Sequence, residues 1–284
     1  MLVKKLFSFL VCSTFALSVQ SQLSAVDYKD EKFISFKASK TFIVKTGNEK
    51  FDSELLQAFK DSWKLTPYDV ISKEEFDKKI SDKSSSFILP VTIETKNITQ
   101  SYHYLAFFNG GKKSLKAYDY EDMIAYCPIN HFLNEGNNLD CGYRVKNMLE
   151  SMCQTIDLIQ KKNIKGNPLN IAKALQEIYN SKSKNIKSRT LLLPDYILGK
   201  LTKADIAGLY PHRFEICTQE KIEQVIKAKS TEYYYYQPGI TLNKSMFVFD
   251  PSNGEVVYFT YQMMGLNIKK KDIEELVETI SGKN

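Results

Sequence analysis

Apolar and polar positions along this chain form two series of strand and helix patterns, one in each half, and both series follow the same order. Each series begins with a short apolar run, "TFIVK" at 41–45 or "TLLLP" at 190–194, which is typical of a buried strand. In the first half, apolar residues then recur at helical spacing and predict a helix. They form one face, made of Phe51, Leu55, Leu56, Phe59 and Trp63.

A second strand and a capped helix come next in both halves. The strands are "YDVI" at 68–71 and "FEIC" at 214–217, and Ser72 and Thr218 are the expected N-caps of the helices after them. Glu75 occupies the capping-box position of the first half. The polar residue at each boundary therefore predicts where the strand ends and the helix begins.

A third strand and a β-hairpin close each series. The third strands are "SFILPVTIE" and "EYYYYQPG", and the predicted hairpin turns are "NGG" at 109–111 and "DPSNGE" at 250–255. The order β-α-β-α-β-β-β predicts an α/β protein made of two similar sandwich units with mixed sheets.

The two halves also share residue identities. Residues 68–87 and 214–233 align without a gap, and the identical pairs are Glu74 with Glu220, Ile80 with Ile226, Lys83 with Lys229, and Ser84 with Ser230. The matching order of elements on both sides of this segment indicates an ancestral tandem duplication.

Helical patterns occupy most of the remaining sequence. A connector helix between the units has an apolar face formed by Val145, Met148, Leu149, Met152, Ile156 and Ile159. A second helix starts at Pro168, and a closing helix spans 270–280. The predicted domains are a signal peptide at 1–21, a first α/β unit at 33–125, a loop and helical connector at 126–186, and a second α/β unit with its closing helix at 187–284.

The first residues have the pattern of a secretory signal peptide. Lys4 and Lys5 precede an apolar run from Leu6 to Val19, and the small and polar residues after it place cleavage before Gln22. An uncleaved anchor is the alternative, although the run is shorter than the roughly 20 residues that span a bilayer. We expect an exported protein, periplasmic or extracellular, that is soluble or peripheral and has no transmembrane segment in the mature chain.

Composition and charge narrow the class of partner. The chain is 43% hydrophobic and 25% charged, as in globular proteins, and its formal charge of +6 includes Lys4 and Lys5. Lysines and acidic residues are interspersed, as on ordinary solvated helix faces. This balance is too mild to predict a nucleic-acid partner.

The second half resembles a family of bacterial envelope domains. The residues that carry the resemblance are "RTLLLP", "RFEICTQEKIEQVI" and "SMFVFDPSNGEVVYF", whose hairpin holds Asp250, Gly254, Glu255 and Val256. This pattern is similar to the domains typified by the curli-secretion protein CsgG, LpoB and the N-terminal domain of TolB. The resemblance covers about the last third well and the first third weakly. It implies a binding or assembly role in the cell envelope and carries over no catalytic residue.

One cysteine-containing loop offers candidate chemistry. Cys127, His131 and Cys141 lie close in sequence, and Cys153 follows in the connector helix. A Cys127–Cys141 disulfide suits an exported protein, whereas zinc binding has no common ligand spacing here. Unpaired thiols and a cysteine nucleophile beside His131 are two further interpretations of the same residues. We predict no metal, no cofactor and no catalytic residue.

The favoured function is therefore non-catalytic binding, with an envelope protein or a glycan as the partner. The candidate binding residues are Tyr234 and Tyr236 in the tyrosine-rich strand and Asn253 and Glu255 in the hairpin turn. At least two of the tyrosines at 233–236 are expected in the core, because alternate side chains on a strand face opposite sides. An exported hydrolase or metal-dependent enzyme that uses the Cys127–Cys141 loop is the alternative.

Overall fold

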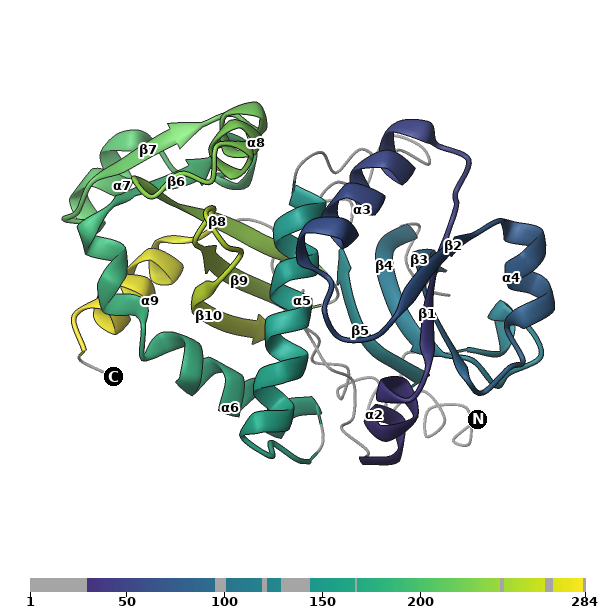
Figure 1. Cartoon of the computed structure of the whole chain (residues 1–284). Coiled ribbons are helices and arrows are strands. Elements are labelled where there is room, and N and C mark those ends of the chain that lie inside the picture. The colour runs from purple at the N-terminus through teal and green to yellow at the C-terminus, as the bar shows by residue number, and fades with distance from the viewer. Residues whose placement is uncertain are drawn as a thin grey trace, which may run out of the picture.

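The computed structural model describes residues 30–94, 101–118, 122–128, 144–166, 168–240, 243–263 and 268–282. It is an α/β structure with two five-stranded mixed sheets, each packed with helices (Figure 1), and this confirms the predicted fold class. The predicted signal peptide lies outside the described residues. Within the described ranges, no helix has both the length and the apolar character needed to cross a bilayer.

Unit one contains the first sheet, whose strand order is β2-β1-β3-β4-β5. Strand β1 pairs in parallel with β2 and β3, whereas the β3–β4 and β4–β5 pairs are antiparallel. Helix α2 (Asp30–Lys37) precedes the unit. The elements of unit one are β1 (Lys40–Val44), α3 (Glu49–Ser62), β2 (Tyr68–Ile71), α4 (Lys73–Lys79), β3 (Ser85–Glu94), β4 (Ser101–Asn109) and β5 (Met123–Pro128).

Unit two repeats this topology in its own sheet, with the strand order β7-β6-β8-β9-β10. Strand β6 again pairs in parallel with two neighbours, and the last two pairs are antiparallel. Its elements are β6 (Thr190–Pro194), α7 (Lys203–Leu209), β7 (Phe214–Cys217), α8 (Gln219–Lys227), β8 (Tyr233–Ile240), β9 (Asn243–Phe249) and β10 (Val256–Met263). The predicted order of elements is thus present in both halves.

Each unit also ends in a helix of its own. Helix α5 (Arg144–Lys161) follows β5 and packs beside α3, and α9 (Lys270–Ile280) follows β10 and packs beside α7. The helix predicted as part of the connector at 126–186 is therefore the counterpart of the closing helix. The described chain between the units includes α6 (Pro168–Asn180) and a short 3-10 helix at Ser183–Ser188.

The strand register corrects one part of the predicted alignment. Phe42 pairs with Phe87 in unit one, and Leu192 pairs with Tyr235 in unit two. Phe87 therefore corresponds to Tyr235, whereas the gap-free alignment predicts Tyr233. The reason is that α8 has 9 residues and α4 has 7. A slip of two residues keeps each side chain on the same face, so the pattern of apolar positions hides it.

The hairpin turn predicted at 250–255 is present, because Asp250 N–H donates to the Glu255 carbonyl at 2.8 Å. The prediction of a tight hairpin turn at 109–111 is wrong, because β4 ends at Asn109 and β5 begins only at Met123. Gly110 N–H instead donates to the Ser85 carbonyl at 2.7 Å, beside the turn between α4 and β3. A Cβ on Gly110 would overlap the Asp82 carbonyl oxygen, so glycine is required here for close packing.

One of the apolar cores runs through both units. In unit one it includes Ile43 and Phe107, on the sheet face toward α3, and in unit two it includes Leu192 and Phe247, on the face toward α8. The register makes Leu193 the counterpart of Ile43, yet Leu193 belongs to a separate core beneath α7 and α9. The two units thus bury opposite faces of equivalent sheets, with α5 between them (Figure 1).

Candidate functional site

The tyrosines of β8 lie in the interior of unit two. Tyr234 is 3% exposed and Tyr236 is 1% exposed, and both pack in the core beneath α7 and α9. Tyr235 is buried in the core shared by the units, and Tyr233 is only half-buried. The expectation that at least two of these tyrosines lie in the core is therefore confirmed. Tyr234 and Tyr236, the candidate binding residues, are not accessible at the surface, because helices cover both faces of the sheet.

The hairpin turn at 250–255 is fixed against neighbouring elements. Asp250 accepts hydrogen bonds from the amide and hydroxyl of Ser252 and forms a 2.8 Å ion pair with Arg189. Glu255 is half-buried and pairs with Lys182 at 2.6 Å. These contacts give the residues of the resemblance motif a structural role in holding the turn.

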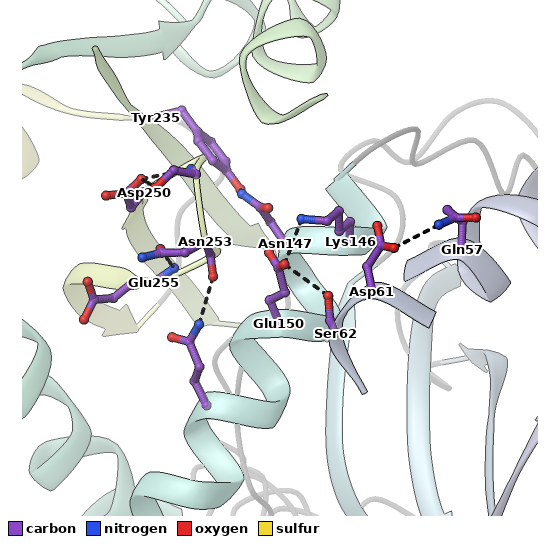
Figure 2. Close-up of polar contacts among 12 residues, drawn as sticks. Gln57, Asp61, Ser62, Lys146, Asn147, Glu150, Tyr235, Asp250, Asn253 and Glu255 are labelled. Atoms are coloured by element: carbon purple, nitrogen blue, oxygen red, sulfur yellow. Dashed lines mark hydrogen bonds and ion pairs between the residues drawn. The ribbon is translucent and has the colours of Figure 1, made fainter. Parts of the chain in front are cut away.

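Asn253 is the exposed member of the turn. Its side-chain oxygen accepts from the Glu255 amide, and its carbonyl accepts from Gln154 of α5 at 2.9 Å (Figure 2). The turn therefore connects unit two to the closing helix of unit one. The proposed binding roles of Asn253 and Glu255 remain predictions.

Polar contacts join α5 to α3 within unit one and to β8 of unit two at the seam between the units, as Figure 2 shows. Glu150 of α5 accepts from Lys146 at 2.7 Å and from the Ser62 hydroxyl at 3.1 Å. One turn earlier, Asn147 donates to the Tyr235 hydroxyl at 3.2 Å. We call these five residues the seam network. Because its members come from α3, α5 and β8, it orients α5 between the two sheets.

The described thiols are poorly suited to nucleophilic catalysis. Burial raises the pKa values of Cys153 and Cys217 to about 12, so both remain neutral near neutral pH. The side chain of Cys127, together with His131 and Cys141, lies outside the described residues, and the disulfide and enzyme interpretations stay predictions. Among the described side chains, no group of three His, Cys, Asp or Glu is arranged to hold a metal ion.

A surface pocket of about 410 Å³ lies in unit one near the carboxyl ends of parallel strands β1 and β2. Helix α3 forms one wall, and β1 and β2 form the floor. Its volume is within the roughly 300–1,000 Å³ typical of small-molecule sites. The lining residues are Ile43, Lys45, Gly47, Glu49, Asp52, Ser53, Leu56 and Val70.

Local sequence explains the shape of this pocket. Gly47 has a φ of +86°, a left-handed conformation that glycine adopts without strain, and it turns the chain from β1 into α3. Asn48 caps the helix by accepting from the Phe51 amide at 3.1 Å. Asp52 accepts from the amides of Thr46 and Gly47 at 2.9 and 3.1 Å. The loop is therefore held in place by side chains at the start of α3.

The sequence patterns did not reveal this pocket. Leu56 is predicted on the buried face of its helix, but it is half-buried because β2 is the edge strand and the sheet ends beneath it. The sequence does contain one signal for this pocket, which is Gly47 between a buried strand and a helix N-cap. Such a loop follows the carboxyl end of a parallel strand, where ligands often bind.

No known protein family, curated protein or solved structure matches the chain.

Proposed function

We propose that the protein is an exported, non-catalytic binding protein of the bacterial cell envelope, and that it recognises its ligand in the pocket of unit one. The pocket is the observation that carries the proposal, because it combines an apolar floor with a charged, accessible rim. The signal-peptide pattern supports export, and the resemblance of unit two to envelope domains supports the location.

Capture of a partner from envelope extract tests the binding role. Val70→Gln places an amide in the pocket floor, and it should abolish specific capture while the chain remains folded. Ile216→Gln is the matched control, because the register makes Ile216 the counterpart of Val70 in unit two and both are half-buried. Equal capture by wild type and both variants would contradict recognition in this pocket.

The intact mass of the protein recovered after expression in bacteria tests export. A mature chain that begins at Gln22 is expected from the pattern at 1–21. Exported material that retains Met1 or Lys4 would contradict the predicted cleavage.

A further inference from the structure

We infer that the pocket of unit one takes a zwitterionic aliphatic ligand, of the class of free aliphatic amino acids and dipeptides. This inference rests on the proposed binding function and names its substrate class. The ligand would place a branched apolar group on the pocket floor, a carboxylate toward Lys45 and an ammonium group toward Glu49.

The floor selects for the apolar part of the ligand. Ile43 lines the pocket but is only 3% exposed, so the half-buried Leu56 and Val70 supply its accessible apolar surface. All three are branched aliphatic residues. An aliphatic group that covers Leu56 and Val70 removes apolar surface of both molecules from water, which favours binding.

The rim selects for the charged parts. Lys45 directly follows β1, and Glu49 is the first residue of α3. Both side chains are exposed and line the pocket, and neither forms an ion pair with another described residue. A cation and an anion on two different elements are therefore both available to a ligand that carries the opposite pair of charges.

The other polar groups of the pocket are already used within the protein. Asp52 accepts from Thr46 and Gly47, and the Ser53 hydroxyl donates to the Lys50 carbonyl at 2.9 Å. The loop amides of Thr46 and Gly47 consequently do not form an anion cradle. A simple anion would also face the carboxylates of both Glu49 and Asp52, which disfavours it.

Unit two does not reproduce this arrangement of charges. The register makes Val44 the counterpart of Pro194, so the residue that corresponds to Lys45 is Asp195. Asp195 begins a 3-10 helix, Asp195–Ile197, where unit one has the loop before α3. We therefore expect one ligand per chain.

Calorimetric titration with leucyl-leucine, and with its N-acetylated and C-amidated forms, tests the inference. The uncapped dipeptide should bind with a stoichiometry of one, and capping either end should weaken binding about fivefold, as for a partly exposed ion pair. Lys45→Gln should remove the penalty of amidation, and Glu49→Gln should remove the penalty of acetylation. Lys60→Gln, an exposed α3 position outside the pocket, is the charge-matched control and should retain both penalties.

Equal affinity for capped and uncapped dipeptides, or an absence of binding to folded protein, would overturn the ligand class. The proposed function can fail separately. If Val70→Gln abolishes partner capture while leucyl-leucine does not bind, the pocket is a recognition site for another chemistry and this inference is wrong. If partner capture is also insensitive to Val70→Gln, both proposals are wrong.

Discussion

At the scale of single residues, Gly254 brings the hairpin backbone of unit two directly against α5. Its φ is +69°, and an added Cβ would lie 2.8 Å from the Glu150 Cβ and 3.0 Å from the Asn147 carbonyl. Gly282 has the same φ, and no atom of the described chain lies within 4 Å of its ideal Cβ. Gly254→Ala and Gly282→Ala therefore share the cost of a left-handed backbone but differ in packing.

We expect Gly282→Ala to lower the free energy of unfolding by about 1–2 kcal/mol. Gly254→Ala should cost about 1–3 kcal/mol more, because α5 and the hairpin must move apart. Urea denaturation of both variants measures the difference. Equal losses would show that the seam can accommodate a methyl group without strain.

The buried thiols give a second prediction at this scale. Burial raises the pKa values of Cys153 and Cys217 to about 12, so each thiol keeps its proton in the folded protein until the pH approaches that value. Alkylation of these two residues at about pH 8 should be slow in the native state and fast in guanidinium, where the ordinary pKa of about 8.5 returns.

The raised pKa values of these two thiols also make the stability of the protein depend on pH. Because the folded state holds these protons more tightly than the unfolded state, stability is unaffected below about pH 8.5 and falls as the pH rises toward 12. Mass spectrometry after timed alkylation locates the modified residues. Rapid modification of Cys153 in folded protein would show that the seam opens readily.

At the scale of elements, the two units offer a matched pair of helix starts. Ser72 accepts from the Glu75 amide and Glu75 accepts from the Ser72 amide, which forms a complete capping box on α4. Thr218 occupies the equivalent position of α8, but the described structure shows no capping hydrogen bond from its side chain.

Ser72→Ala should therefore lower the free energy of unfolding by about 1 kcal/mol. Thr218→Ala should cost less than about 0.5 kcal/mol, because no cap is lost. Denaturant titration of the two variants compares them directly. A larger loss from Thr218→Ala would contradict the contrast between the caps.

The elements also show which inferences the sequence supports. The closing helix was predicted at 270–280 and has these bounds, because Ile273, Leu276 and Ile280 recur at helical spacing. The register of β8 and the turn after β4 were mispredicted, because both depend on contacts between segments. The pocket could not be predicted for the same reason. Leu56 and Val70 are partly exposed because β2 lies at the edge of the sheet, and the sequence pattern does not reveal which strand is at the edge.

At the scale of the whole molecule, the repeat is asymmetric in its packing. Helix α5 is buried along most of its length between the units, whereas its counterpart α9 exposes Lys270, Lys271, Glu274 and Glu278. A charged outer face of this kind is typical of the terminal unit of a repeat array. The apolar surface of α5 packs against the neighbouring unit, whereas the charged surface of α9 faces solvent.

The shared core predicts that the two units unfold together. Trp63 is the only tryptophan and reports on unit one, whereas Phe259 is buried in unit two and stacks on Phe247 with ring centroids 4.8 Å apart. Phe259→Ala should cost about 3–5 kcal/mol, because it leaves a cavity in the core that α5 shares with both sheets.

If the units are coupled, Phe259→Ala lowers the midpoint of the Trp63 fluorescence transition and the midpoint of the circular dichroism transition by the same amount. Ile34→Ala, at a site that is 67% exposed, is the control and should change stability by less than about 0.5 kcal/mol. A Trp63 transition that stays in place while circular dichroism shows a second, earlier transition would mean that the units fold independently. In that case the seam network and the apolar contacts of α5 with unit two would contribute little to the stability of unit one.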